Sequence, residues 1–336
     1  MRVSFFREQT VTTVFESTTL KTDPLVRRFD DVRQLLPDAD QPTPIVRLGR
    51  TAGARALYLK LEWLNPFGSI KDRAAAYMLS ELLPEIAGRR LVEASSGNTA
   101  LALAALAGLE GIPVTVTIPE GAPIEKRVLL RMLGAEVLET PDDLCPVDLP
   151  GDGAIALARA IARSRGGEDY VWTDQYSNSA NVSAHYETTG PEIWRQTQGQ
   201  VRTFVAGFGT CGTITGVGRF LKEQDPSIRI VAVEPNAGHR LPGLKSFAEA
   251  SEPEILDRTV IDQVVRIDDE TAYAKTLDLF RQEGLMVGPS TGAIVAGALA
   301  LDDPALTVAI SPDSGFKYAS FFSQYLDQHP QRKDDQ

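Results

Sequence analysis

The sequence contains few of the side chains that form disulfides and bind metals. Only Cys145 and Cys211 supply thiols, and the three histidines lie far apart along the 336 residues. Two cysteines cannot build a disulfide scaffold, and structural zinc sites need about four cysteine or histidine ligands at close spacings. We therefore expect no structural or catalytic metal site.

Long apolar runs and an excess of positive charge are also missing. No stretch of about 18 apolar residues occurs, and the N-terminus, MRVSFFREQTVTTVFE, lacks the basic-then-apolar order of a signal peptide. We therefore expect a cytoplasmic protein. The net charge of −11 at pH 7 argues against a nucleic-acid or anionic-membrane partner, because phosphate groups are bound by clustered lysine and arginine. A small anionic ligand can still be bound by local groups.

What the sequence does contain is 43% hydrophobic residues, enough for a substantial core in two domains or one large one. Apolar runs typical of strands alternate with segments of helical period. The predicted strands cover 89–95, 113–119, 135–139, 169–174, 203–207, 228–234 and 305–312, and three of the predicted helices cover 212–223, 269–283 and 290–301. Continuously apolar strands separated by helices are typical of parallel sheets covered on both faces. The sequence thus predicts an α/β protein of two doubly wound units.

Residues 65–75, NPFGSIKDRAA, place a lysine where a helix begins. Ser69 is a suitable N-cap, and Asp72 follows three residues later as in a capping box, so Lys71 falls in the first turn. The helix dipole penalises a cation there and lowers its pKa. A lysine driven toward neutrality becomes a nucleophilic amine that can form a Schiff base. The alternative is a solvated surface lysine.

A glycine-rich turn, GFGTCGTITG at 207–216, follows a predicted strand and opens a helix. It fits the Gly-x-Gly-x-x-Gly dinucleotide fingerprint, with Glu234 at the end of the next strand. However, such a turn at a helix N-terminus presents backbone N–H groups to any phosphate, and it can also be a plain strand–helix connection.

Two further turns carry hydroxyl groups before predicted helices. Ser95, Ser96 and Thr99 suit a carboxylate, or they form a simple capped turn with Ser96 or Asn98 as the N-cap. Ser290 lies near the start of an alanine-rich helix. Open α/β sheets bind ligands at the carboxyl ends of their strands, so the three turns predict one shared crevice.

Together these motifs resemble the fold-type-II family of pyridoxal-phosphate enzymes, in particular its cysteine synthase and cystathionine β-synthase branch. The resemblance covers roughly residues 43–320 and replaces the dinucleotide interpretation. It is carried by TPIVRL at 43–48, NPFGSIKDRAA at 65–75, SSGNTA at 95–100, DQYSNSAN at 174–181, HYETTGPEIW at 185–194, GTCGTITGVGRFLKE at 209–223, VEP at 233–235, GPSTGA at 288–293 and PDSG at 312–315.

The resemblance implies a tryptophan-synthase-β-like fold of two doubly wound domains with mostly parallel sheets. The large, phosphate-binding domain would consist of residues 43–64 plus 179–328, and the small mobile domain, which carries the carboxylate turn, of residues 65–178. Residues 1–42 would be an N-terminal extension and residues 329–336 a polar tail.

The resemblance also implies roles for single residues, with pyridoxal 5'-phosphate as cofactor. Lys71 would form the Schiff base, Asn98 would contact the ring hydroxyl, and Ser290 would face the pyridine nitrogen. The phosphate loop would be Gly209, Thr210, Cys211, Gly212 and Thr213. The substrate carboxylate would be bound by Ser95, Ser96, Asn98 and Thr99, with Gln175 contributing from the second domain. A serine hydroxyl cannot keep a proton on the pyridine nitrogen as a carboxylate does, which favours β-elimination over transamination.

The implied activity is cysteine biosynthesis. An activated serine, O-acetylserine or O-phosphoserine, would undergo β-replacement by a sulfur nucleophile through the Lys71 Schiff base and an aminoacrylate intermediate. Alternatives that share the cofactor are cystathionine synthesis from serine or acetylserine plus homocysteine, and serine or threonine dehydration. A non-catalytic homologue that holds a partner's C-terminal peptide, as family members hold that of serine acetyltransferase, is disfavoured by the intact Lys71. The family's usual state is a homodimer, which we expect here.

The chain departs from the family pattern in three places, the smallest of which is Ala100, the last residue of SSGNTA, where glycine is common. Cys211 stands where many members have glycine. Residues 238–257, GHRLPGLKSFAEASEPEILD, replace a glycine-rich entrance segment and add His239, Arg240 and Lys245 near the expected mouth of the site. One hypothesis is that the leaving group is phosphate and that one of these cations recognises it. The alternative is a solvated basic loop.

Overall fold

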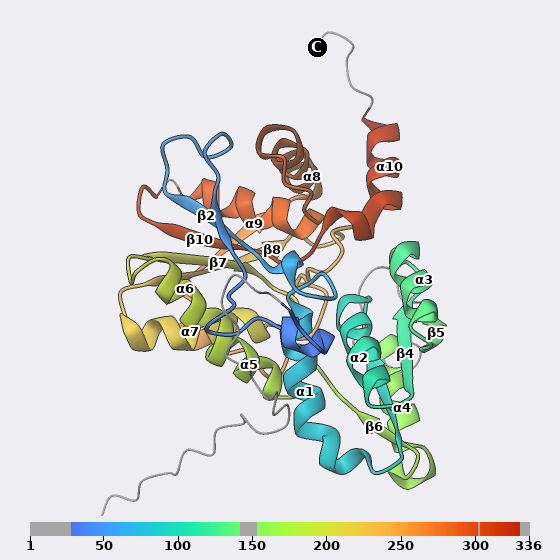
Figure 1. Cartoon of the computed structure of the whole chain (residues 1–336). Coiled ribbons are helices and arrows are strands. Elements are labelled where there is room, and N and C mark those ends of the chain that lie inside the picture. Colours follow the sequence, from blue (N-terminus) through green and yellow to red (C-terminus); the bar gives the residue numbers. More distant parts are fainter. Residues whose placement is uncertain (1–27, 142–152, 302, 330–336) are drawn as a thin grey trace, which may run out of the picture.

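The computed structural model describes residues 28–141, 153–301 and 303–329, and its strands form two sheets (Figure 1). The described residues do not include residues 1–27 of the predicted N-terminal extension, Cys145, or residues 330–336 of the predicted polar tail. The six-stranded sheet has the order β1 (Ile45–Arg47), β2 (Leu57–Leu61), β10 (Thr307–Ser311), β7 (Thr203–Gly207), β8 (Arg229–Pro235) and β9 (Gln263–Ile267). The four-stranded sheet has the order β5 (Glu136–Thr140), β4 (Val114–Pro119), β3 (Arg90–Ala94) and β6 (Tyr170–Trp172).

Strand pairing confirms the predicted mostly parallel sheets. Every pair in the four-stranded sheet is parallel, and in the six-stranded sheet β1 is antiparallel to β2 while the other pairs are parallel. The helices are α1 (Lys71–Ile86), α2 (Asn98–Leu109), α3 (Ile124–Met132), α4 (Ala154–Arg163), α5 (Ala180–Ala184), α6 (Gly190–Gln196), α7 (Gly212–Gln224), α8 (Asp269–Asp278), α9 (Pro289–Ala300) and α10 (Ala319–Gln328). Among the described residues, no helix is long and apolar enough to cross a bilayer.

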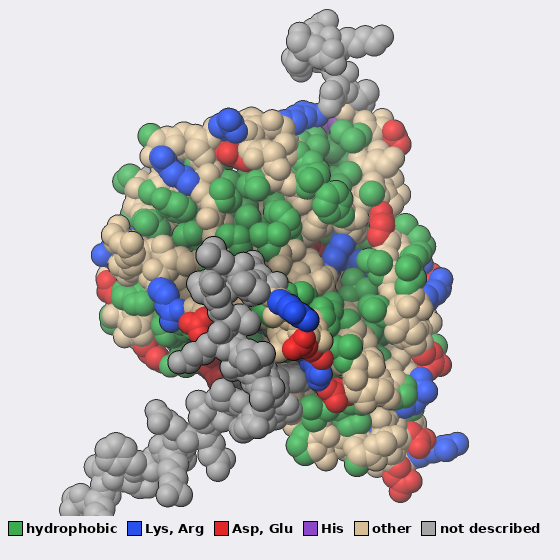
Figure 2. All heavy atoms as spheres, in the orientation of Figure 1, with side chains coloured by type: hydrophobic (Ala, Val, Ile, Leu, Met, Phe, Trp, Pro, Cys, Tyr) green, Lys and Arg blue, Asp and Glu red, His purple; other side chains and the backbone are tan. Residues whose placement is uncertain are grey.

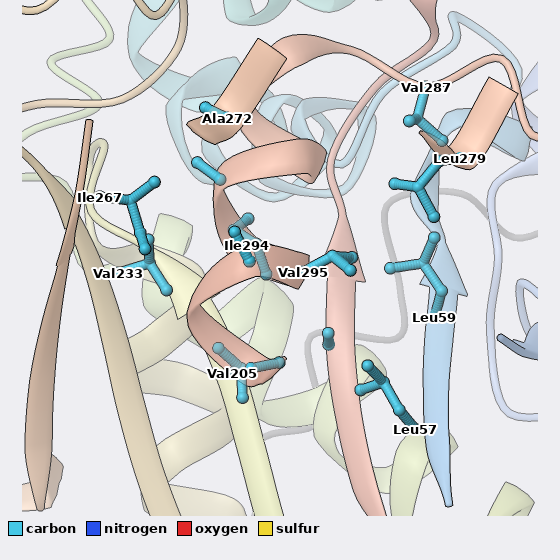
Figure 3. Packing of buried hydrophobic residues seen from close by; sticks show 14 of the residues in the cluster. Leu57, Leu59, Val205, Val233, Ile267, Ala272, Leu279, Val287, Ile294 and Val295 are labelled. Carbon is cyan, nitrogen blue, oxygen red and sulfur yellow. The ribbon is translucent and has the colours of Figure 1, made fainter. Parts of the chain in front are cut away.

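The continuously apolar strands are explained by helices on both faces of the six-stranded sheet. In Figure 1, α8 and α9 lie on one face and α5 to α7 on the other. Val205 of β7 packs with Ile294 of α9, as Figure 3 shows, whereas its neighbour Phe204 packs with Val217 of α7 on the opposite face. Successive side chains of a strand point to opposite faces, so both must be apolar when both faces are buried.

The helices and strands that were predicted agree closely with the structure, but some elements were missed and one helix is shorter. Strands β1, β2 and β9 and helices α5, α6 and α10 were not predicted. β9 is an edge strand whose Gln263 and Val264 are exposed, so it lacks the continuous apolar pattern. The helix predicted over 269–283 ends as α8 at Asp278, and a wider π-helical turn covers Leu279–Glu283.

The surface seen in Figure 2 carries both signs of charge. Lysine and arginine side chains on this face are scattered among aspartate and glutamate rather than gathered into one patch. This face therefore has no clustered basic surface of the kind that binds nucleic acid.

Candidate active site

A cavity lies where segments that follow the carboxyl ends of strands in both sheets meet. Its wall includes residues that follow β3, β6, β7 and β10, together with the start of α1 and of α9. The predicted site residues in this wall are Lys71, Ser95, Ser96, Asn98, Thr99, Gln175, Gly209, Thr210 and Ser290. The structure thus brings together most of the residues that the sequence singled out, from both sheets.

The start of α1 differs in detail from the predicted capping box. Ile70 occupies the N-cap, and Lys71 is the first helical residue. The Lys71 N–H donates to Ser69 Oγ at 3.3 Å, but the Asp72 carboxylate accepts from the Phe67 N–H at 2.6 Å rather than from Ser69 N–H. Asp72 therefore folds the loop before the helix back onto its first turn, and this fixes the backbone that carries Lys71.

The amine of Lys71 points to the glycine-rich turn. Its Nζ donates to Thr210 Oγ1 at 2.9 Å. Burial lowers the pKa of Lys71 to about 8, while a Coulombic interaction with Glu93 opposes this shift. The lowered pKa was predicted from the helix dipole, but desolvation of the ammonium is the main cause. About a tenth of the amine is therefore unprotonated and nucleophilic at pH 7, far more than for an ordinary lysine.

This lowered pKa makes the stability of the cofactor-free protein depend on pH. The unfolded chain keeps the Lys71 proton up to about pH 10.5 and the folded chain up to about pH 8. Because the unfolded state binds more protons between these values, the free energy of unfolding should rise with pH across this window. We expect this rise to be smaller in Lys71→Met, which shares all other titrating groups. Urea unfolding at steps from pH 7 to 10 measures the difference, and parallel curves for the two proteins would contradict it.

The turn Gly209–Thr213 joins β7 to α7 and places a helix N-terminus beside the cavity. A Cβ at Gly212 would lie 2.1 Å from Asn181 Oδ1, so only glycine allows the first turn of α7 to pack on this asparagine. Asn181 Nδ2 also donates to Thr210 Oγ1 at 3.1 Å. Gly209 and Thr210 reach the cavity wall, whereas Cys211, Gly212 and Thr213 form the start of the helix behind it.

Cys211 adopts the left-handed conformation, with φ of 68°, at the N-cap of α7. A side chain is disfavoured there relative to glycine, which explains physically why glycine is common at this position in the family that the sequence resembles. Burial raises the pKa of the Cys211 thiol to about 12, so it stays protonated and neutral next to Lys71.

The turn after β3 begins α2 in a way that neither predicted N-cap fits. Gly97 is the N-cap, with φ of 128°, and Ser95 Oγ accepts from the N–H groups of Gly97 at 3.0 Å and Ala100 at 3.4 Å. A Cβ at Gly97 would lie 2.5 Å from Cδ of Lys126, so glycine is also required by packing. The hydroxyl groups of Ser96 and Thr99 flank this turn in the cavity wall.

Gln175 joins the turn from the same four-stranded sheet, in agreement with the predicted small domain 65–178 and not as a contribution from a second domain. It follows β6, and its Oε1 accepts from the Thr99 hydroxyl at 2.5 Å while its Nε2 donates to the Ala94 carbonyl at 2.8 Å. Ser290 comes from the six-stranded half, as Gly209 and Thr210 do, and it is the second residue of α9 and 3% exposed.

The sequence assigned no site role to Ile70, Tyr176, Gly243, Pro312 or Asp313, all of which line the cavity. Pro312 and Asp313 belong to the PDSG motif at 312–315, so this motif could have indicated them as site residues. Of the three cations in the departing segment, Lys245 lines the cavity and is 6% exposed, with Nζ 4.8 Å from the centroid of the Tyr176 ring. His239 and Arg240 do not contribute to that wall, and Arg240 is exposed.

A buried ionic cluster lies beneath the first turn of α1. Arg73 Nε donates to Glu62 at 2.8 Å, and its Nη1 and Nη2 donate to the two oxygens of Glu192 at 2.6 and 2.8 Å. Lys60 Nζ donates to Glu192 at 2.6 Å. Each of these four side chains is at most 2% exposed, and their formal charges cancel. The cluster ties β2 and α6 to the helix turn that carries Lys71.

The arrangement fits pyridoxal phosphate by the chemistry of its donor groups. An aldehyde requires an amine that is partly neutral, which Lys71 supplies, and a phosphate requires a helix N-terminus without side-chain crowding, which the Gly209–Thr213 turn supplies. Ser290 adds a neutral hydroxyl and Asn98 a neutral amide to the same wall.

Comparisons with known proteins agree with this chemistry. The profile of the family described as "Pyridoxal-phosphate dependent enzyme" matches residues 36–313. Cysteine synthase B of Salmonella typhimurium is 40% identical over 286 residues, which cover 83% of this chain and 92% of that protein. Cysteine synthase A of Escherichia coli is 40% identical over 304 residues, with coverage of 83% and 91%. A crystal structure of O-ureido-L-serine synthase has a TM-score of 0.79 and 33% identity, covering 92% of this chain and 98% of that one.

Proposed function

The chain belongs to the family of pyridoxal-phosphate-dependent enzymes, and on that premise we propose that it makes cysteine by replacing the β-substituent of an activated serine with a sulfur nucleophile. The observation that carries the proposal is the partly neutral amine of Lys71, which shares one cavity with a carboxylate-type turn and a phosphate-type turn. The identity of about 40% to cysteine synthases supports the choice of product.

Each group in the cavity has a proposed task. Pyridoxal phosphate, when bound, withdraws electrons from the substrate and so acidifies its Cα–H bond. The Gly209–Thr213 turn would hold the cofactor phosphate through backbone N–H groups, and Ser290 would present a neutral hydroxyl to the ring nitrogen. Lys71 would hold the cofactor covalently, and its free Nζ would be the base that takes the Cα proton and later returns it.

The turn Ser95–Thr99 is proposed to bind the substrate carboxylate. The N-terminal N–H groups of α2 and the hydroxyl group of Ser96 are the donors that a carboxylate requires, because the single proton of the Thr99 hydroxyl is donated to Gln175. Gln175 holds Thr99 in place through the hydrogen bond between their side chains.

The proposed function is tested by supplying the cofactor-loaded protein with O-acetylserine or O-phosphoserine together with sulfide, and identifying the products by mass spectrometry. Cysteine supports the proposal. Cystathionine formed from serine or acetylserine with homocysteine, or pyruvate formed without any nucleophile, would instead identify the two alternative activities. A colourless protein that takes up no cofactor would indicate a binding homologue. A homodimer, a cytoplasmic location and a serine acetyltransferase peptide as partner remain expectations from the family resemblance.

Among the activated serines, Lys245 favours a substrate with an anionic leaving group. Its ammonium is buried in the cavity wall, where a charge–charge interaction is screened less than at the surface. An O-phosphoserine phosphate therefore has a cationic partner within the site, and an O-acetyl group gains little from it. Arg240, a candidate from the sequence for recognising the phosphate, is not part of the cavity wall.

We expect Lys245→Met to lower kcat/KM for O-phosphoserine by about tenfold to a hundredfold, as for loss of a charge-assisted hydrogen bond, and to change kcat/KM for O-acetylserine less than about threefold. Arg240→Met is the matched control and should leave both values unchanged. Steady-state kinetics with both substrates decide the matter. A marked preference for O-acetylserine that Lys245→Met leaves unaltered would contradict the choice of phosphate.

A further inference from the structure

The side-chain amide of Asn98 is held between two charged groups that follow β10. Its Nδ2 donates to Asp313 Oδ2 at 2.6 Å, and Lys317 Nζ donates to its Oδ1 at 3.4 Å. An ionised carboxylate only accepts and an ammonium only donates, so both contacts are favourable in one orientation of the amide and unfavourable in the other. In that orientation the second hydrogen on Nδ2 remains to serve an acceptor in the cavity, whose wall includes Asn98.

Asp313 is itself held firmly in place. It is 1% exposed, its Oδ2 also accepts from the Tyr318 hydroxyl, and Lys126 Nζ lies 3.9 Å from Oδ2 while donating to Tyr318 at 2.8 Å. A Cβ at Gly288 would lie 2.1 Å from Asp313 Oδ1, so the glycine leaves room for this carboxylate. A carboxylate with these partners has little freedom to rotate away from Asn98.

Lys317 is anchored on the segment that leads to Lys71. Its Nζ donates to the Phe67 carbonyl at 2.9 Å, and the side chain is 9% exposed. Burial lowers the pKa of Lys317, while Asp313 and Asp72 oppose this shift by charge. Lys317 thus connects the loop before α1 with the side chain of Asn98.

Asp313 and Lys317, which we call the Asn98 clamp, link the two halves of the site. Asn98 begins α2 after β3 of the four-stranded sheet, whereas Asp313 and Lys317 follow β10 of the six-stranded sheet. We propose that Asp313 and Lys317 are positioning residues that fix the Asn98 amide with a donor toward the cofactor's ring oxygen. The inference rests on the proposed function for the role of Asn98, but the clamp itself is a property of the protein without cofactor.

A double-mutant cycle tests whether the clamp acts through Asn98. The cofactor-free protein is titrated with pyridoxal phosphate, and binding is followed by visible absorbance. We expect Lys317→Met and Asn98→Ala each to weaken binding by about tenfold, and the double variant to be no weaker than the single Asn98→Ala, because contacts that act through one residue are not additive. Lys317→Arg should restore affinity to within about threefold. Lys222→Met, which removes a surface ion pair with Asp262, is the control and should have no effect.

A second measurement is independent of the cofactor. In the cofactor-free protein, we expect amide hydrogen exchange at Thr99–Leu101 to be faster in Lys317→Met than in the wild type and normal in Lys317→Arg. Additive effects in the double variant, or unchanged affinity and exchange in Lys317→Met, would overturn the clamp. If the wild type takes up no pyridoxal phosphate, the proposed function fails, and the exchange measurement still decides the clamp.

Discussion

Lys71→Ala should abolish covalent attachment of pyridoxal phosphate and lower kcat by about a thousandfold or more. The amine is both the group that reacts with the aldehyde and the proposed base at Cα, and loss of a positioned acid–base group alone costs about 10² to 10⁴ in rate. Borohydride reduction of the cofactor-loaded protein followed by peptide mass spectrometry should find the added mass on the peptide that contains Lys71.

Lys245→Met is the control for this experiment, because Lys245 is a lysine that lines the same cavity. We expect it to retain the reducible attachment. The assignment of Lys71 is wrong if the modified peptide contains Lys245, or if Lys71→Ala keeps the attachment and its rate.

Arg73→Met should destabilise the protein by about 3–5 kcal/mol, the range observed when one partner of a buried ion pair is removed. The guanidinium makes hydrogen bonds to both Glu62 and Glu192, and without it these two buried carboxylates are opposed by Lys60 alone. Urea unfolding measures the loss.

A matched control for Arg73→Met is Arg131→Met, which removes an exposed ion pair with Glu139 and should cost less than about 1 kcal/mol. Adding Glu192→Gln to Arg73→Met should recover part of the stability, because it removes one uncompensated charge. Equal effects of Arg73→Met and Arg131→Met would show that the cluster contributes no more than a surface pair.

The same cluster should make the protein sensitive to acid. Burial by itself raises the pKa of Glu62, but the charges of Arg73 and Lys60 outweigh it and lower the pKa to about 2. A lowered carboxyl pKa contributes stability that is complete above the unfolded value of about 4.5 and is lost as the pH falls from there to about 2. In Arg73→Met, where burial is no longer outweighed, the pKa of Glu62 should no longer lie below its unfolded value, so the loss of stability in acid that Glu62 causes in the wild type should disappear.

The sequence predicted the parts of the site that depend on local order along the chain. The strand-to-helix turns at Ser95, Gly209 and Ser290 follow apolar strands, and the parallel sheets bring such turns to one edge. The position of Lys71 at a helix start was likewise predictable within one residue, because Ser69 and Asp72 are short-range signals.

What the sequence did not predict depends on contacts between distant segments. Asp313 meets Asn98 across a separation of 215 residues, and no local pattern encodes that distance. The cause of the Lys71 pKa shift was also missed, because desolvation depends on the whole surrounding wall rather than on the helix that carries the lysine. That Gln175 lies beside the Ser95–Thr99 turn depends on β6 being the neighbour of β3, and the order of strands within a sheet cannot be determined from spacing alone.

The order of strands also has a consequence for synthesis of the chain. In the six-stranded sheet, Leu57 of β2 pairs with Thr307 of β10, whereas all strands of the four-stranded sheet lie between residues 90 and 172. The four-stranded half can therefore assemble while the ribosome is still translating, but β2 must wait for nearly the whole chain before its parallel partner, β10, emerges. While β10 is still inside the ribosome, the nascent chain lacks both this strand and Asp313 of the cavity wall. We therefore expect the chain to bind its vitamin B6 cofactor only in the last stage of folding.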